Sequence, residues 1–253
     1  MINDKTAIEY LTKLEDNELS QDNFDDIKKK LEINDYPQDL LDRYLLYYAS
    51  RNKYDETKFL INSGVNVNSN NNGYVFRIVV RCGYTDIVKL FIDAGLNITI
   101  FDDLIMIIAS SNYVDIMKIF LLELPMSNII RMSYNHALLS ACRCGYLQMV
   151  QLLLDFGTDI NYANGLPLIQ ACCTNNFDVA KYLINIGVNV CVQSNRPILE
   201  VIKNENLDMA QLLLDAGASI NNPCLMEFAI DKKSDKIINF LKKNGLNNST
   251  TSI

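Results

Sequence analysis

Polar and apolar positions along residues 134–164 follow a helical period and predict two short amphipathic helices. The first spans Ala137–Cys144, Gly145 breaks it, and the second spans Leu147–Asp155 before Gly157 and an Asn-rich turn. Each helix is apolar on one side only, through Leu138, Leu139 and Ala141 in the first and Met149, Val150, Leu152, Leu153 and Leu154 in the second. A helix of about eight residues is marginal alone in water, so the pair must bury its apolar side against neighbours.

The same pair of helices returns every 28 to 33 residues. The glycine that ends the second helix recurs at Gly64, Gly95, Gly157, Gly187, Gly217 and Gly245. A small apolar residue recurs in the first helix at Ala49, Val79, Ala109, Ala141, Ala171, Val201 and Ala229. The turn before the first helix keeps Asp, Asn or Ser at Asp42, Asn72, Asp102, Asn164, Ser194 and Asn222, with Tyr134 as the exception. Three series with one period predict an all-α helical solenoid.

Three motifs within this period resemble the ankyrin repeat. The A-x-x-G-H part corresponds to Cys142-Arg143-Cys144-Gly145-Tyr146. The I-V-x-x-L-L part corresponds to Ile87-Val88-Lys89-Leu90 and Met149-Val150-Gln151-Leu152-Leu153-Leu154. The closing G-A-D-V-N corresponds to Gly64-Val65-Asn66-Val67-Asn68, Gly157-Thr158-Asp159-Ile160-Asn161 and Gly217-Ala218-Ser219-Ile220-Asn221. The resemblance implies an ankyrin-repeat solenoid of about seven helix-turn-helix repeats.

The resemblance covers residues 42–246. We expect repeats at 42–71, 72–101, 102–133, 134–163, 164–193, 194–221 and 222–246, preceded by an acidic helical cap at 1–41 and followed by a disordered tail at 247–253. The T-P-L-H part of the motif keeps its proline only at Pro167 and Pro197. The third repeat has Leu124-Pro125-Met126 where its closing glycine belongs. Short, Asn- and Ile-rich repeats of this kind resemble those encoded by giant, mimivirus-like DNA viruses.

Composition and the N-terminal sequence indicate the cellular compartment of the protein. No apolar run among the 253 residues is long enough to cross a bilayer, and the start MINDKTAIEY lacks a signal-peptide pattern. Seven cysteines without framework spacing indicate a reducing compartment. We therefore expect the cytoplasm, that of a host cell if the protein is viral, with the nucleus as the alternative, and no association with membranes.

Negative charge is concentrated at the N-terminus. Residues 1–42 contain twelve Asp and Glu against five Lys, whereas the rest of the chain has eighteen of each sign. Neutral repeats argue against nucleic-acid binding. The acidic segment has apolar residues at helical spacing, at Ala7, Ile8, Leu11 and Leu14 and again at Phe24, Ile27 and Leu31. It either caps the apolar end of the first repeat or docks a partner.

Candidate chemistry in the repeats has structural explanations. An acid opens most second helices, where it complements the helix dipole, at Asp55, Asp86, Asp115, Asp178 and Asp208. Cys142 and Cys172 occupy equivalent positions in successive repeats, as small buried residues do. His136 is the only histidine, and the chain has neither a phosphate-binding glycine loop nor G-x-S-x-G. We expect no enzyme activity, no metal and no cofactor.

The remaining candidate site is a surface. In ankyrin proteins the first helices and turns line the concave groove, where partners usually bind. One series along this groove is Arg51, Arg81, Ser111, Arg143, Cys173 and Lys203, and a second is Tyr44, Tyr74, Leu104, His136, Leu166 and Arg196. Arginine and tyrosine are frequent interface anchors. The predicted partner-binding residues are Tyr44, Arg51, Tyr74, Arg81, His136, Arg143, Arg196 and Lys203.

The sequence thus predicts a monomeric, non-catalytic module that binds an acidic segment of another protein, for a viral chain a host protein. The alternative is an adaptor that recruits a target to a ubiquitin ligase or similar machinery through the N-terminal segment. The resemblance also implies asparagine hydroxylation in the closing turn, at Asn68, Asn161 and Asn221.

Overall fold

The computed structural model describes residues 24, 38–124 and 127–246, and these form helices and turns without a strand. The α-helices follow one another in seven pairs, and a short 3₁₀ helix, η1 (Ile98–Ile100), lies between the second and third pairs. The pairs are α3 (Gln38–Ala49) with α4 (Tyr54–Asn62), α5 (Asn70–Cys82) with α6 (Thr85–Asp93), α7 (Leu104–Ser110) with α8 (Val114–Glu123), α9 (Asn128–Cys144) with α10 (Leu147–Asp155), α11 (Tyr162–Cys173) with α12 (Phe177–Asn185), α13 (Val192–Lys203) with α14 (Leu207–Asp215), and α15 (Pro223–Asp231) with α16 (Asp235–Lys243).

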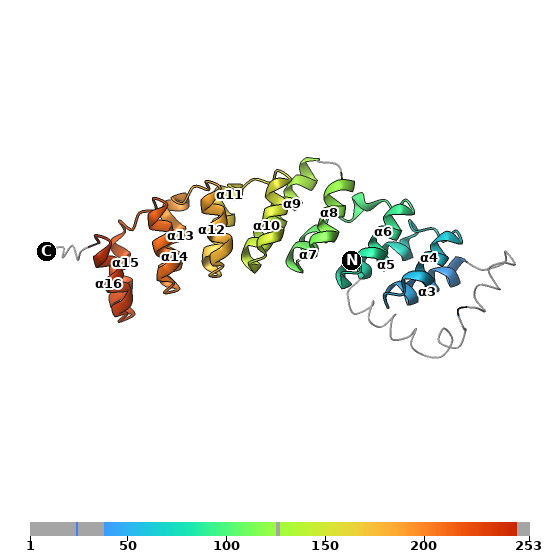
Figure 1. Cartoon of the computed structure of the whole chain (residues 1–253), viewed down its shortest axis with the longest axis horizontal. Helices are drawn as coiled ribbons and strands as arrows, with labels where there is room; N and C mark the ends of the chain where they lie inside the picture. The colour runs from blue at the N-terminus through green and yellow to red at the C-terminus, as the bar shows by residue number, and fades with distance from the viewer. Residues whose placement is uncertain (1–23, 25–37, 125–126, 247–253) are drawn as a thin grey trace. The chain divides into compact units, whose positions relative to one another are not determined.

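Figure 1 labels the helices along the chain. By their contacts they fall into two compact units, one within Met1–Leu104 and Asp115–Pro125, the other within Ile105–Val114 and Met126–Ile253. In the first compact unit α3 packs on α4 and α5, and α6 packs on α4 and α5. In the second, α11 packs between α9 and α13, and α12 between α10 and α14. Each compact unit therefore has a layer of first helices and a layer of second helices, as the solenoid prediction requires.

One backbone hydrogen bond recurs in all seven helix pairs. The N–H of the residue that precedes the second helix donates to the carbonyl oxygen five residues earlier, at 2.9 to 3.1 Å. The donors are Lys53, Tyr84, Tyr113, Tyr146, Asn176, Asn206 and Ser234. The residue before each donor is left-handed, and these residues are Asn52, Gly83, Asn112, Gly145, Asn175, Glu205 and Lys233. This bond, rather than residue type, defines which positions are equivalent between repeats.

The glycines at the ends of the second helices adopt the predicted left-handed conformation. Their φ angles lie between 83° and 97°, at Gly64, Gly95, Gly157, Gly187, Gly217 and Gly245. Beyond Gly95, the Leu96 N–H bonds the Phe91 carbonyl, and this six-residue closure satisfies a helix-end acceptor. In the third pair the equivalent residue is Leu124, which has no positive φ and is buried. Helix α8 accordingly runs to Glu123, one residue longer than the other second helices.

The small residues predicted inside the first helices all lie in the core. Each is 0% exposed, at Ala49, Val79, Ala109, Ala141, Ala171, Val201 and Ala229. In the first compact unit the core also contains an aromatic cluster, in which the Phe76 ring lies 5.0 Å from that of Phe101 and 5.8 Å from that of Phe91.

Helix α9 is longer than predicted, because it begins at Asn128 rather than at Ala137. Its N-cap is Ser127, whose hydroxyl accepts the Ile130 N–H at 3.3 Å. The residue that departs from the turn pattern, Tyr134, is helical and fully buried. Where the turn residue is Asn164, the backbone turns left-handed and interrupts the helix. Tyrosine does not favour that conformation, so α9 continues through it.

The predicted cap at 1–41 and tail at 247–253 lie almost wholly outside the described residues. Within the cap, Phe24 is helical, and its ring makes edge-to-face contacts with Tyr48 and Phe59 at 5.3 and 5.5 Å. Among the described residues no helix combines the length and apolarity needed to span a bilayer.

Candidate protein-binding face

The recurring backbone bond places three positions of every first helix on one side. Counted back from the donor, they are the tenth, sixth and third residues, and residues three and four apart share a helix face. We call these positions the first-helix face. In the first compact unit they are Arg43, Tyr47 and Ser50, then Tyr74, Ile78 and Arg81. In the second they include His136, Ser140 and Arg143, then Leu166, Gln170 and Cys173, then Arg196, Glu200 and Lys203.

Two predicted partner-binding residues were one position out of register. Tyr44 is 2% exposed and belongs to the core, so its prediction as a surface contact is wrong. The equivalent of Tyr74 in the first repeat is Arg43, which is exposed and which the sequence prediction missed. Arg51 likewise follows the position equivalent to Arg81, which Ser50 occupies. The residue types of the first helix carry no signal for this shift, and the backbone bond from Lys53 to Tyr48 identifies Arg43 as the equivalent residue.

In the first compact unit arginine and tyrosine lie along the first-helix face, with Arg51 one position beyond it. The guanidinium carbon of Arg51 lies 4.0 Å from the centre of the Tyr47 ring, and Nη1 donates to the Tyr47 carbonyl at 3.3 Å. Arg43 and Arg81 are exposed, while Tyr47 and Tyr74 are half-buried. We call these five residues the arginine–tyrosine face. Stacked and flanking guanidinium groups over apolar rings form a cationic surface that also offers apolar contact.

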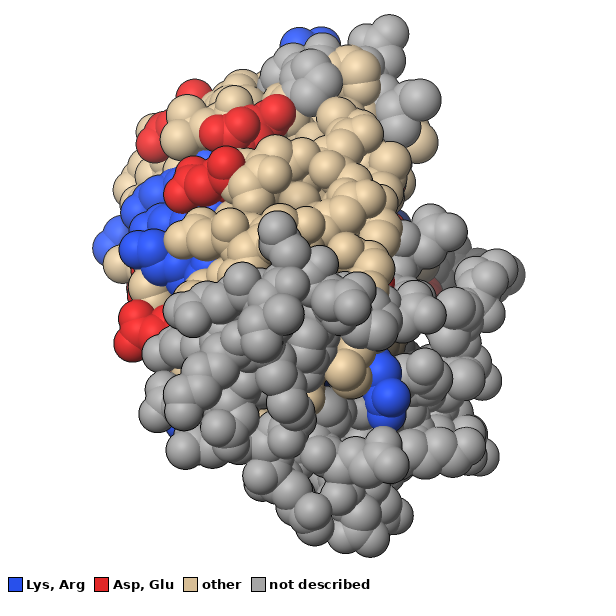
Figure 2. Space-filling model, turned by 90° about the vertical axis from the view of Figure 1, so that its right-hand side faces the viewer, with Lys and Arg blue, Asp and Glu red and all other residues tan. Residues whose placement is uncertain are grey.

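Helix α5 contains no Asp or Glu, and its Arg77 forms an ion pair with Asp103. On α3 the Asp42 carboxylate is buried, and it accepts hydrogen bonds from the Asn72 amide at 2.9 Å and the Gln38 amide at 3.1 Å. The Asp42 carboxylate is thus hydrogen-bonded within the core and is not exposed at the face. Figure 2 shows its largest group of Lys and Arg side chains beside several Asp and Glu, with smaller Lys or Arg patches elsewhere and other residues over most of the remaining coloured surface.

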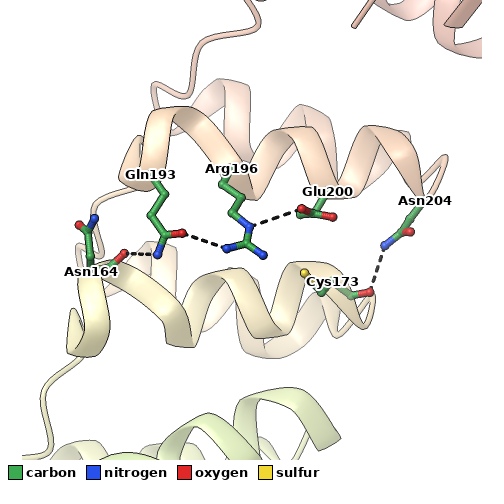
Figure 3. Close-up of polar contacts among 6 residues, drawn as sticks. All are labelled: Asn164, Cys173, Gln193, Arg196, Glu200 and Asn204. Carbon is green, nitrogen blue, oxygen red and sulfur yellow. Dashed lines mark hydrogen bonds and ion pairs between the residues drawn. The ribbon is translucent and has the colours of Figure 1, made fainter. Parts of the chain in front are cut away.

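In the second compact unit the face is more strongly engaged internally. The Tyr162 hydroxyl lies at hydrogen-bond distance, 3.0 Å, from Nε2 of His136. Figure 3 shows Arg196 between Gln193 and Glu200: its Nη1 donates to the side-chain Oε1 of Gln193 at 3.0 Å, and its Nε lies 3.4 Å from the Glu200 carboxylate. Gln193 in turn donates to the Asn164 carbonyl at 3.2 Å. Glu200 therefore offsets the charge of Arg196.

Two cations of the second compact unit remain exposed on the face, Arg143 and Lys203. Beside them, the Asn204 amide donates to the Cys173 carbonyl at 3.0 Å, and the Asn176 amide donates to the Arg143 carbonyl at 2.8 Å. These side chains tie neighbouring first helices together at their C-terminal ends. The Arg143 carbonyl is thus held by the side chain of the next repeat, and Lys203 lies directly before Asn204.

The described residues do not assemble a reactive centre. No group of three or more His, Cys, Asp or Glu side chains within them is placed to hold a metal ion. Burial raises the pKa of the Cys142 thiol beyond its ordinary range and that of Cys172 to about 12, so both stay protonated. The helix-opening acids take their predicted first-turn places, and Asp115 forms an ion pair with Lys118 at 2.9 Å that lowers its pKa.

The closing turns share a second recurring feature. A side-chain oxygen of the Asx or Ser residue accepts the N–H two residues on, as at Asn97 with Thr99 and Asp159 with Asn161. Asn68 makes a further bond to the next repeat, where its amide donates to the Gly95 carbonyl at 2.9 Å. Asn161 and Asn221 are exposed at the equivalent position. Hydroxylation of these three asparagines stays a prediction.

Comparison with known proteins agrees with this architecture. Residues 104–194 match the family model described as ankyrin repeats (3 copies). Similar solved structures include the human ASB11 ankyrin repeat domain, with 20% identity over 70% of this chain and 85% of that one, and a TM-score of 0.58. An ankyrin repeat domain from Acinetobacter baumannii AYE shows 18% identity over 69% and 98%, with a TM-score of 0.56. The ankyrin repeat protein EF0377 shows 21% identity over 68% and 96%, with a TM-score of 0.55.

Helix pairs with left-handed closures, stacked in two layers, define the class of helical repeat solenoids. Within that class the fold is that of an ankyrin-repeat protein. Such repeats generally mediate protein–protein interaction and are typically non-catalytic. A comparison with curated proteins gives no match. The predicted giant-virus origin gains no support from these comparisons.

Proposed function

We propose that the protein binds a partner protein without catalysis, and that the arginine–tyrosine face is the principal contact. The supporting observation is that the packed helices α3 and α5 carry two exposed arginines, Arg43 and Arg81, together with the half-buried tyrosines Tyr47 and Tyr74. Arginine and tyrosine carry a large share of binding energy at protein interfaces. An acidic partner would complement the positive charge of Arg43 and Arg81, which are exposed on α3 and α5.

The partner fitted by this face is a segment that combines carboxylates with an aromatic or aliphatic side chain. Carboxylates pair with the planar guanidinium fork in a two-point geometry. An apolar side chain gains contact with the tyrosine rings. The second compact unit has its own exposed cations, Arg143 and Lys203, on its first helices, whereas Arg196 is offset by Glu200. We therefore assign that unit a secondary part in binding.

Charge reversal tests the proposal. Selection of displayed short peptides on the full chain supplies a ligand, and fluorescence anisotropy then measures its affinity. The double variant Arg43→Glu with Arg81→Glu should weaken binding at least roughly tenfold, because two central anchors become repulsive. The matched control is Lys58→Glu with Lys89→Glu, which reverses two exposed lysines on the second helices α4 and α6.

The control should bind the selected peptide as the unchanged chain does, and both variants should melt at similar temperatures by circular dichroism. Selection that yields no acidic peptides would contradict the proposal. So would equal binding by the two variants.

The adaptor alternative depends on residues 1–41, of which the described part is Phe24 and the start of α3. No described contact favours it, so it stays a prediction. The proposal further places the protein in the cytoplasm as a monomer without nucleic-acid ligands. Its support is the cysteine usage and the neutral charge of residues 43–253.

A further inference from the structure

Phe24 marks the point where the N-terminal segment meets the first helix pair. Its ring stands edge-on to Tyr48 of α3 and to Phe59 of α4, with interplanar angles of 71° and 79°. Tyr48 is buried and Phe59 is half-buried. Aromatic pairs of this geometry are favourable contacts beyond their buried area. Phe24 therefore has a fixed place on the first compact unit.

The segment before this point has the charge opposite to that of the arginine–tyrosine face. Residues 1–23 contain six acids, Asp4, Glu9, Glu15, Asp16, Glu18 and Asp22, against Lys5 and Lys13, so four negative charges remain. The same residues include apolar side chains among the acids, such as Leu11 and Leu14. This combination is the one that the arginine–tyrosine face is expected to bind.

The distances permit contact. Tyr48 and Arg43 lie on one helix, five residues apart, which corresponds to about 7.5 Å along the helix axis. Arg81 lies on α5, which packs directly against α3. A segment of 23 residues spans several times that distance when extended, at roughly 3.3 Å per residue. A tethered ligand also binds at a high effective concentration, so weak contacts suffice.

We propose that residues 1–23 occupy the arginine–tyrosine face of the same chain as an internal acidic ligand, which an outside partner has to displace. This inference rests on the proposed function, because it names what regulates access to the same face. The internal ligand lowers the apparent affinity for the partner, and its charge-based contacts weaken as salt is added.

Limited trypsin digestion of the full chain tests occupancy. Mass spectrometry follows cleavage after Lys5 and Lys13, which stay unchanged in every variant. At low salt the variant Arg43→Glu with Arg81→Glu should be cut at these lysines roughly fivefold faster than the unchanged chain, as loss of two ion pairs implies. The Lys58→Glu with Lys89→Glu control should be cut at the unchanged rate. Added salt should remove the difference.

A reciprocal variant keeps the arginines and removes the ligand charge, through Glu15→Gln, Asp16→Asn and Glu18→Gln. It should be cut as fast as the arginine variant, and it should bind the selected acidic peptide several-fold more tightly than the unchanged chain. Circular dichroism melts check that all variants are folded. Equal cleavage rates at low salt in all variants would overturn the inference.

The two proposals fail in different ways. If acidic peptides bind the face but cleavage and affinity do not respond to the N-terminal acids, the internal ligand is excluded and the binding function stands. If cleavage responds as expected but no outside peptide binds even the reciprocal variant, the face serves only the chain's own segment and the binding function is excluded.

Discussion

At the scale of single residues, the left-handed position before each second helix shows how local strain is distributed. Gly occupies it at Gly83 and Gly145, and Asn in three further repeats. Glu205 and Lys233 take the same conformation, with φ of 59° and 53°. Glycine adopts this conformation freely and asparagine tolerates it, whereas other side chains meet the neighbouring carbonyl. The two C-terminal repeats therefore contain strain that the others avoid.

Replacing Glu205 by Gly should raise the free energy of unfolding by about 1 kcal/mol, because the exposed side chain is lost and the strained φ is relieved. Urea denaturation followed by circular dichroism measures the change. The matched control, Asn175→Gly, should gain less, since asparagine already tolerates a φ of 58° at that position. A larger gain in the control than in the Glu205 variant would contradict this explanation.

The buried thiols should make stability depend on pH. The folded pKa of Cys172 is raised to about 12, above the value of about 8.5 expected in the unfolded chain. Its contribution to stability is therefore complete below the unfolded pKa and is lost as the pH rises toward the folded one. The urea midpoint should fall between roughly pH 8 and pH 10, and it should fall less in Cys172→Ala. The exposed-thiol control, Cys144→Ala, should keep the slope of the unchanged chain.

At the scale of elements, the contact between α11 and α13 depends on the absence of a side chain. Gly165 has a φ of 78°, and a Cβ added there would lie 2.6 Å from Val192 Cγ1 and 2.7 Å from Cγ2. Near the start of α11 the residues Ala163, Asn164 and Gly165 are left-handed and interrupt the helix. The residues Gln193, Ser194 and Asn195 interrupt α13 in the same way. The Asn195 side chain accepts the Ser219 N–H at 3.0 Å and fixes its turn to the closing turn of the same repeat.

The variant Gly165→Ala should lower the free energy of unfolding by about 2 to 3 kcal/mol, through backbone strain and the clash with Val192. In a chain that already carries Val192→Ala, the variant Gly165→Ala should lower the free energy of unfolding by less than it does in the unchanged chain. The clash is then absent, while the backbone strain stays. A double-mutant cycle from urea denaturation measures the coupling. Strictly additive effects would show that the close approach of α11 and α13 has no energetic weight.

At the scale of the whole molecule, the chain forms two compact units, and each contains its own layers of first and second helices. The boundary falls where the third repeat departs from the pattern, with Leu124 in place of a closing glycine and an α9 that starts early. Helical repeats contact mainly their neighbours, so stability is a sum of local terms. Changes at one end should therefore act locally.

The variant Phe24→Ala should destabilise α3 and α4 by about 2 kcal/mol, through loss of a half-buried ring. Hydrogen exchange with mass spectrometry should show faster exchange in α3 and α4 and no change in α13 to α16. The conservative variant Phe24→Leu should have a smaller effect. Unchanged exchange in α3 and α4 would show that the ring contacts do not cap the first repeat.

The sequence by itself determined the period, the helix pairs and the glycine-closed ends of the second helices. These follow from local chemistry, because a glycine with positive φ ends a helix wherever it stands, and the predicted second helix Leu147–Asp155 was confirmed to the residue. Only the tertiary structure decided the register of the first repeat. A shift of one residue rotates a side chain by about 100° around a helix, so it exchanged the buried Tyr44 for the exposed Arg43. Residue type could not reveal that shift, whereas the backbone bond from Lys53 to Tyr48 fixes it.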